Sequence, residues 1–177
     1  MENCTIYYED TNKRCRQYAE KFSAHPNIEC RKISEYKEKT NIYEPNRAVG
    51  FIFYSGYGKL SYELKKIIWR IVIPEDAYLF LLVADGGREI DSLRNVAKEL
   101  EERGYEVTNV YSEYFFDKYH ITDRPKKILD DMEKGESIWQ REHEKVREMN
   151  RRELRHHLKE NLKSYKSYKR RKKEKKL

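Results

Sequence analysis

The sequence predicts an α/β protein: a parallel five-stranded sheet, doubly wound, with helices on both faces in three layers. Segments rich in β-branched and aromatic residues alternate with segments whose apolar residues recur every three or four positions, which is typical of βαβ units. Two strand-like segments, 48–55 and 77–84, are apolar almost throughout, as expected for strands buried on both faces. The right-handed crossover between parallel strands then favours the doubly wound arrangement.

The five expected strands differ in character along the chain. The segment 28–33 alternates apolar and polar residues and is expected to be short and exposed, whereas the run AYLFLLVA at 77–84 is the best candidate for the centre of the sheet. The polar segment 37–47 is expected to be a loop. The strands are predicted at 4–8, 28–33, 48–55, 77–84 and 105–111.

Three helices are expected between these strands, at 12–23, 60–71 and 89–103. Each presents apolar residues at helical spacing on one side, which suits packing against a sheet. Gly104 follows the third helix and is a natural C-terminal cap. Between Lys126 and Leu162 only Gly135 interrupts a helical pattern, so one long helix or two joined helices are expected there.

The charge is divided unevenly along the 177 residues. Residues 137–177 contain 16 basic and 6 acidic residues, a net charge of +10, whereas residues 1–136 contain 22 basic and 25 acidic residues, a net charge of −3. Such asymmetry indicates an interaction tail. We therefore expect an α/β domain over residues 1–136 and a basic helical C-terminal extension over residues 137–177.

Composition and motifs exclude several classes of protein. The three cysteines form no CxxC pair, so the pattern indicates neither a disulfide framework nor a metal site. The first residues lack the layout of a signal peptide, and no apolar run approaches the roughly 18 residues that span a bilayer. A cytoplasmic protein is expected. The sequence contains no GxSxG, phosphate-binding GK[ST] or HExxH motif.

Three stretches together resemble the flavodoxin-like family. YYEDTNKRC at 7–15 stands where the family has its phosphate loop, YSGYGKL at 54–60 resembles the loop after its third strand, and ADGGR at 84–88 resembles the loop after its fourth strand. The segment RPKKILDDMEKGE at 124–136 is like one that follows the fifth strand in small bacterial members. The similarity covers about residues 3–136.

The resemblance implies an FMN site built from these three loops. The first loop would hold the phosphate and the other two would flank the isoalloxazine, with Tyr57 as the stacking residue and the amides of Gly86 and Gly87 at the pyrimidine edge. The implied cofactor-binding residues are Asp10, Thr11, Asn12, Lys13, Arg14, Cys15, Ser55, Gly56, Tyr57, Gly58, Asp85, Gly86 and Gly87.

The first loop departs from the family pattern, because it carries Glu9 and Asp10 and no glycine. Carboxylates repel a phosphate, and Lys13 and Arg14 can offset this charge. They cannot replace glycine, because the left-handed backbone of such a turn costs free energy in a residue with a side chain. The alternative is that Asp10 or Thr11 simply caps the following helix. Cys15 near a helix N-terminus suggests either a reactive thiol or a core residue. No catalytic residue is indicated.

The end of the chain, KSYKSYKRRKKEKKL, combines cations with Tyr165 and Tyr168. Cations bind phosphates by counterion release, and tyrosines stack on unpaired bases. Nucleic acid or another polyanion is therefore one candidate partner. The first alternative is a solvated tail without a partner. The second is an anionic membrane surface, although the tail lacks an apolar face to insert into it. The candidate polyanion-binding residues are Lys163, Lys166, Lys169, Arg170, Arg171, Lys172, Lys173, Lys175 and Lys176.

Two functions follow from the sequence. The first is an FMN-binding electron-transfer protein with a degenerate phosphate loop, which serves a redox partner protein. The second is a cofactor-free binding or adaptor module whose basic tail contacts nucleic acid, another polyanion or a partner protein, because a common fold with a degenerate site often becomes an interaction surface.

Overall fold

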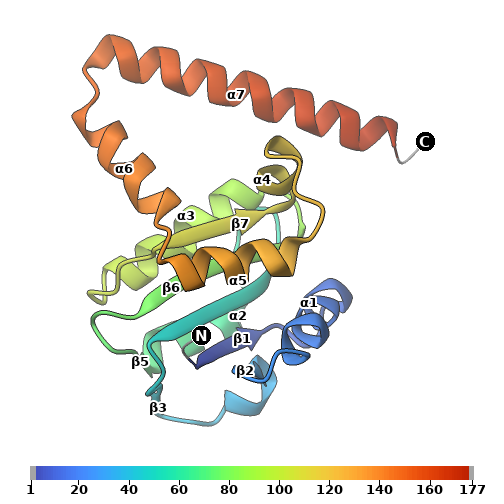
Figure 1. Ribbon diagram of the computed structural model, residues 1–177, viewed down its shortest axis with the longest axis vertical. Helices are drawn as coiled ribbons and strands as arrows, with labels where there is room; N and C mark the ends of the chain where they lie inside the picture. The colour runs from blue at the N-terminus through green and yellow to red at the C-terminus, as the bar shows by residue number, and fades with distance from the viewer. Residues whose placement is uncertain (1–2, 176–177) are drawn as a thin grey trace.

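The computed structural model describes residues 3–175 and contains a five-stranded, all-parallel sheet (Figure 1). Its strands follow the spatial order β2-β1-β4-β6-β7, a flavodoxin-like layout in which the order reverses between β1 and β4. The predicted five-stranded parallel sheet is confirmed. The strands are β1 (Cys4–Tyr8), β2 (Ile28–Lys32), β4 (Ala48–Ser55), β6 (Tyr78–Gly86) and β7 (Asn109–Ser112).

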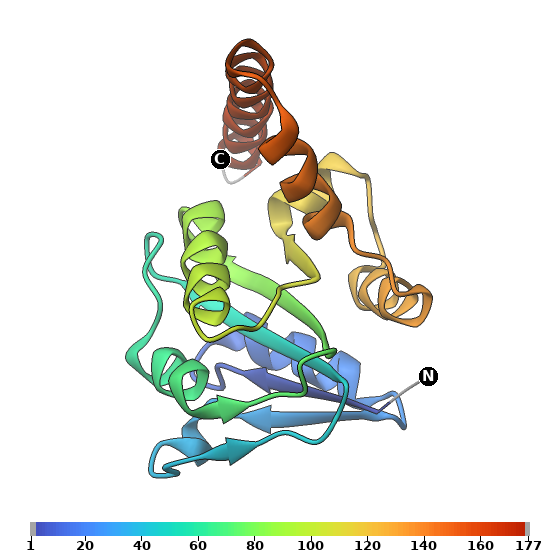
Figure 2. The same cartoon turned by 90° about the vertical axis from the view of Figure 1, so that its left-hand side faces the viewer.

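Helices cover both faces of this sheet, so the domain has three layers (Figure 2). On one face α1 (Lys13–Ser23) and α5 (Arg124–Lys134) bury their apolar residues against β1, β4 and β6. On the other face α2 (Tyr62–Arg70) and α3 (Glu89–Glu101) pack in the same way. Since each strand alternates its side chains between the faces, β4 and β6 contribute to both cores.

A second, two-stranded parallel sheet was not predicted. β3 (Ile42–Tyr43) lies inside the segment expected to be a loop, and β5 (Ile71–Val72) follows α2 directly, so that helix ends at Arg70. A short 3-10 helix, Ile33–Tyr36, precedes β3. Ile42 and Ile71 are both buried, which explains why the two short strands pair.

Two of the predicted boundaries in the main sheet were wrong by two residues or more. β7 begins at Asn109 instead of residue 105, because Thr108 Oγ1 accepts from Leu79 N (3.1 Å) and Tyr105 Oη accepts from Ile73 N (3.2 Å), outside any ladder. β6 continues to Gly86, two residues beyond its predicted end, after a register shift between Phe53 and Tyr54 of β4.

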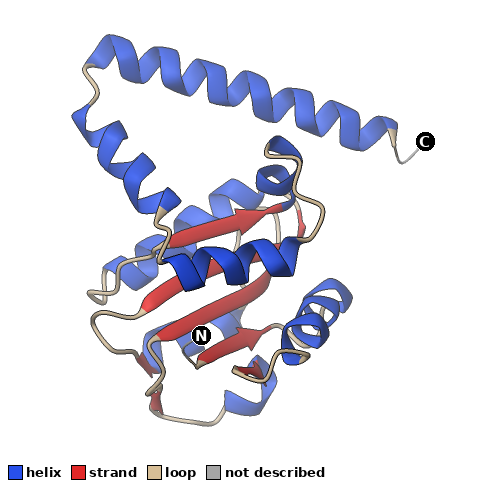
Figure 3. Ribbon diagram, viewed as in Figure 1, coloured by secondary structure: helices blue, strands red, loops and turns tan. Residues whose placement is uncertain are grey.

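The part of the chain after β7 is helical (Figure 3). It comprises α4 (Glu113–Lys118), α5, α6 (Ile138–Glu148) and α7 (Arg151–Glu174). One long helix or two joined at Gly135 were expected; the chain does break at Gly135, and a second break at Met149 and Asn150 was not predicted. The second break is fixed by a capping box, in which Asn150 Oδ1 accepts from Glu153 N (3.0 Å) and Glu153 Oε2 accepts from Asn150 N (2.9 Å).

A buried polar network ties the chain before β4 to β1 and β2. The fully buried Glu44 carboxylate accepts from Thr5 Oγ1 (3.0 Å) and Tyr7 Oη (2.9 Å) and forms an ion pair with Arg31 (3.0 Å). Because every buried charge needs such partners, this cluster fixes the loop that leads into the central strand. Within residues 3–175, no helix is long and apolar enough to cross a bilayer.

Candidate functional site

The loops after β1, β4 and β6 come together at the carboxyl edge of the sheet (Figure 1), because the strands are parallel neighbours. This edge is where the flavodoxin-like resemblance puts FMN. The hydrogen bonds within each loop show which donors remain available for a ligand.

Asn12 caps the N-terminus of α1. Its Oδ1 accepts from the backbone amides of Arg14 (2.9 Å) and Cys15 (3.1 Å), and its carbonyl oxygen accepts from Arg16 N (3.2 Å). The cap is therefore Asn12, and the expectation that Asp10 or Thr11 plays this part was wrong. A capped helix end offers an anion fewer free amides, because the same N–H groups would bind a phosphate.

The two carboxylates of the turn link it to neighbouring loops. Glu9 Oε2 accepts from Tyr54 N (2.6 Å) and Glu9 Oε1 accepts from the Ser61 hydroxyl, which also caps α2. Burial raises the pKa of Glu9, although these hydrogen bonds oppose the effect. Asp10 accepts from Ser34 N (3.1 Å) and Ser34 Oγ (2.7 Å). Both carboxylates thus act as structural acceptors.

The other residues of this turn divide between surface and core. Thr11 and Lys13 are exposed, and Arg14 forms an ion pair with Glu113 (3.6 Å). Cys15 is fully buried in the α1 core, and burial raises the pKa of its thiol. A raised thiol pKa disfavours the reactive thiolate, so the core interpretation of Cys15 fits the structure.

A tight hairpin forms the loop after β4. The amides and carbonyls of Gly56 and Lys59 pair (3.2 and 3.1 Å), and Tyr57 and Gly58 both have positive φ values, 55° and 87°, as in a two-residue type I′ turn. Ser55 holds the turn in place, since its Oγ accepts from Gly58 N (3.2 Å) and contacts Ser92 Oγ. The Tyr57 side chain is 78% exposed at the tip.

The loop after β6 is bonded to this hairpin. Gly87 N donates to the Ser55 carbonyl oxygen (3.1 Å), and Gly86 N donates to Asp85 Oδ1 (2.8 Å). Gly86 has a φ of 105° and lies so close to Ser55 that a Cβ would overlap the Ser55 backbone. The Tyr57 ring faces Gly87, with ring carbons 3.7 and 3.8 Å from where a Gly87 Cβ would stand.

The polar groups of these loops therefore bond within their own loop or to a neighbouring one. The amides of Arg14 and Cys15 in the first loop, and those of Gly86 and Gly87 that the resemblance implies for the pyrimidine edge, all donate to internal acceptors. The Tyr57 ring already covers Gly87. A ligand that used these four amides would have to replace their hydrogen bonds, each worth about 1 kcal/mol.

Beside this edge, the second half of α7 packs on α4. The Tyr114 ring contacts the rings of Tyr165 (5.1 Å between centroids) and Tyr168 (5.3 Å), and Tyr114 Oη donates to Ser164 Oγ (2.9 Å). Arg171 forms an ion pair with Asp117. Tyr168 is buried, so the two tyrosines expected to stack on bases instead anchor the helix.

The candidate polyanion-binding residues consequently differ in the contacts that they make with the rest of the protein. Arg171 is paired with Asp117, and Lys169 and Lys172 lie over the rings of Tyr165 (5.4 Å) and Tyr168 (5.6 Å). Lys176 lies outside the described residues. The remaining five, all exposed on α7 or at its end, are Lys163, Lys166, Arg170, Lys173 and Lys175.

Glu89, the first residue of α3, was not singled out by the sequence. It is 5% exposed, and burial raises its pKa to about 7, although Lys172 and Lys169 of α7 oppose this shift. The docked α7 thus lies close enough to Glu89 for its lysines to favour the charged form of that carboxyl. An acidic residue in a first helical turn is common, so nothing in the sequence marks this one.

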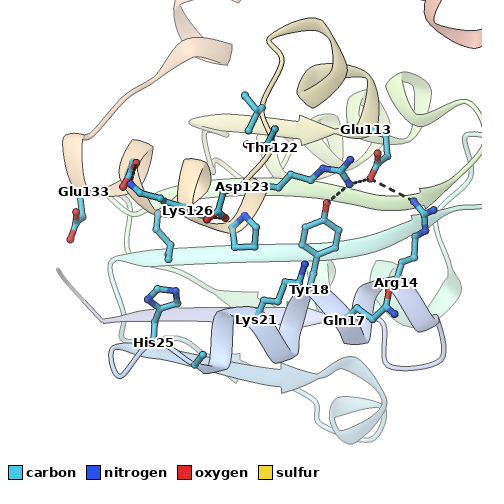
Figure 4. Close-up of a pocket in the computed structure, with 16 residues that line it drawn as sticks. Arg14, Gln17, Tyr18, Lys21, His25, Glu113, Thr122, Asp123, Lys126 and Glu133 are labelled. Carbon is cyan, nitrogen blue, oxygen red and sulfur yellow. Dashed lines mark hydrogen bonds and ion pairs between the residues drawn. The ribbon is translucent and has the colours of Figure 1, made fainter. Parts of the chain in front are cut away.

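A surface groove between α1 and α5 was also not predicted (Figure 4). In its wall the Arg124 guanidinium forms an ion pair with Glu113, donates to Tyr18 Oη (3.2 Å) and lies over the Phe116 ring (5.4 Å). Lys126 pairs with Asp130 (2.6 Å) across one helical turn. The lining contains four basic and four acidic residues, so the groove has no net charge to favour an ion of either sign.

No family model, no curated protein and no solved structure matches this chain. Among residues 3–175, no group of three or more His, Cys, Asp or Glu side chains is arranged to hold a metal ion. A functional assignment therefore depends on the contacts and charges of the chain itself.

Proposed function

We propose that this protein is a cofactor-free binding module that contacts nucleic acid through the outer face of α7. The observation that carries the proposal is the division of α7 into two faces. Its tyrosines contact Tyr114 of the domain, whereas Lys163, Lys166 and Arg170 are exposed to solvent. Phosphates attract such an array by counterion release, and residues 137–177 supply a net charge of +10.

The internal bonding of the three loops supports the cofactor-free part of the proposal. A ligand site keeps some polar groups free to orient its ligand. Here the amides of Cys15, Gly86 and Gly87 are used within the loops, and Glu9 adds a carboxylate to the turn. The edge of the sheet then serves as a rigid support for α4 and α7.

The test is fluorescence anisotropy with labelled DNA and RNA of mixed sequence, titrated with the full chain at low salt. We expect dissociation constants of about 1 μM, since several phosphate contacts give non-specific binding of roughly this strength. An absence of binding to both nucleic acids at low salt would refute the proposal.

An FMN-binding electron-transfer protein with a redox partner is the second candidate. The sheet order favours it, because this order brings the three loops to one edge, and Tyr57 presents an aromatic ring beside Gly87. Freshly purified protein would then be yellow, and the bound flavin would supply the redox chemistry. Colourless protein that leaves FMN fluorescence unchanged would eliminate this candidate.

A further inference from the structure

Exposed cations form a row along α7 that begins well before the basic end of the sequence. Successive members are three or four residues apart, which places them on one face of a helix. At 1.5 Å per residue the row is about 31 Å long. Its seven members are Arg152, Arg155, Lys159, Lys163, Lys166, Arg170 and Lys173, all exposed.

The docking of α7 determines where this row points. Ser164, Tyr165 and Tyr168 contact Tyr114, so they define the inner face of the helix. Each residue turns the helix by about 100°, which puts Lys166 and Arg170 on the opposite side from Tyr168. Figure 1 shows α7 crossing over α4 along the outside of the domain. The row therefore faces solvent along its whole length.

The seven side chains also keep their charge available. Among the described residues, none of the seven side chains forms an ion pair, in contrast to Arg171, which is bound to Asp117. The helix contains three acidic residues, and one of them, Glu153, bonds to the Asn150 amide in the capping box. A row of unpaired cations at this density repels itself, and a matching array of anions relieves that repulsion.

We propose that this row binds double-stranded nucleic acid, lying along the phosphates of the duplex. The inference rests on the proposed function and specifies its ligand. A duplex presents phosphates in a stiff, regular array of high charge density, to which a rigid row of cations on a helix is complementary. Phosphate contacts alone carry little sequence information, so binding discriminates weakly between sequences.

Single strands fit the same surface less well. Proteins that bind them rely on aromatic side chains on which successive bases stack. The aromatic residues of α7, Tyr165 and Tyr168, are turned toward Tyr114, and the outer face presents none. A single strand therefore loses the stacking energy and keeps only the weaker phosphate attraction.

The first three members of the row separate this proposal from that of a flexible basic tail. Arg152, Arg155 and Lys159 lie in the first turns of α7, apart from the dense cations near its end. A flexible tail needs only the dense cations, whereas a duplex that lies along the whole helix contacts both parts. Removing these three charges therefore tests the geometry of the row as well as its charge.

The experiment compares the full chain with two triple variants that lose the same charge. The row variant carries Arg152→Ala, Arg155→Ala and Lys159→Ala; alanine preserves the helix. The control variant carries Lys37→Ala, Lys39→Ala and Arg47→Ala, exposed residues that precede and follow β3, and Figure 1 shows β3 at the opposite end of the domain from α7. Anisotropy is measured with 20-base-pair DNA and RNA duplexes and with a single strand of the same length.

We expect the wild-type chain to bind a duplex at least fivefold more tightly than the single strand. The row variant should lose roughly tenfold in duplex affinity at about 100 mM salt, and the control variant less than threefold. Equal or tighter binding to the single strand, or equal losses in both variants, would overturn the duplex proposal and leave nucleic-acid binding intact. Failure to bind any probe would refute the proposed function itself.

Discussion

The Tyr168 ring packs against the Tyr114 ring with their centroids 5.3 Å apart, and only 6% of Tyr168 is exposed. These two residues are separated by 54 positions and join α7 to α4. The contact decides the orientation of α7, because it turns the tyrosine face inward and leaves the cations outside. The arrangement makes the last helix a structured part of the molecule.

Replacing Tyr168 with alanine should therefore release the end of α7. Loss of a buried aromatic ring costs about 2–3 kcal/mol in such a contact. Hydrogen exchange of the amides in Arg151–Glu174 should speed up, while exchange in β4 and β6 stays slow. Tyr168→Phe keeps the ring contact and is the control. Unchanged exchange in the alanine variant would show that the contact does not hold the helix.

Glu89 gives the stability of the protein a specific dependence on pH. Its pKa is about 7 in the folded chain against an ordinary value of 4.5, because burial disfavours the charged form. The folded state thus binds this proton more tightly than the unfolded state. Stability from this group is fully present below about pH 4.5 and decreases as the pH rises through about 7.

Glu89→Gln should remove that decrease, because glutamine does not ionise. Chemical unfolding at pH 5 and pH 8 should show a gain in stability for the variant at pH 8 of up to about 3 kcal/mol, relative to its effect at pH 5. Glu20→Gln on the exposed side of α1 is the control and should change neither value. A variant with the same pH profile as the wild type would contradict the prediction.

Asn12 should contribute to stability as a helix cap. Asn12→Ala removes the acceptor for the amides of Arg14 and Cys15 and should cost about 1 kcal/mol, measured by chemical unfolding. Asn12→Asp keeps a capping oxygen and should cost much less. If alanine and aspartate have the same effect, the side chain is not the cap.

Gly86 and Gly104 offer a matched pair of substitutions. Both have positive φ values, 105° and 85°, so alanine is strained at either position. A Cβ at Gly86 also overlaps the Ser55 backbone, whereas a Cβ at Gly104 meets nothing within 4 Å. Gly104→Ala should cost about 1 kcal/mol and Gly86→Ala about 3 kcal/mol or more, by thermal unfolding. Equal costs would show that the two loops do not approach so closely.

The sheet could be predicted from the sequence because its signals are local. The segments 48–55 and 77–84 are apolar almost throughout, and amphipathic helices alternate with strands, which leaves few topologies. The pair β3 and β5 could not be predicted, since strands of two residues, Ile42–Tyr43 and Ile71–Val72, have no periodicity and pair only through tertiary contact.

The candidate site was harder to predict because its contacts are long-range. In the sequence alone, Glu9 and Asp10 are unfavourable charges beside a phosphate. Their hydrogen-bond partners Ser61 and Ser34 are 52 and 24 positions away, so the sequence does not indicate these bonds. The tyrosines of α7 were likewise predicted to stack on bases, whereas in the structure they contact Tyr114. The row of exposed cations can be predicted from helical spacing alone. Arg152, Arg155 and Lys159 continue the spacing of the later cations.

The salt dependence of duplex binding tests the central claim most directly. If about five or six cations of α7 contact phosphates, the slope of log affinity against log salt should be about −5 for the wild-type chain. The variant Lys166→Ala, Arg170→Ala, Lys173→Ala should show a slope of about −2, and the variant Lys37→Ala, Lys39→Ala, Arg47→Ala should keep the wild-type slope. A slope unchanged by the three α7 substitutions, or no duplex binding at about 50 mM salt, would contradict the claim that the outer face of α7 binds nucleic acid.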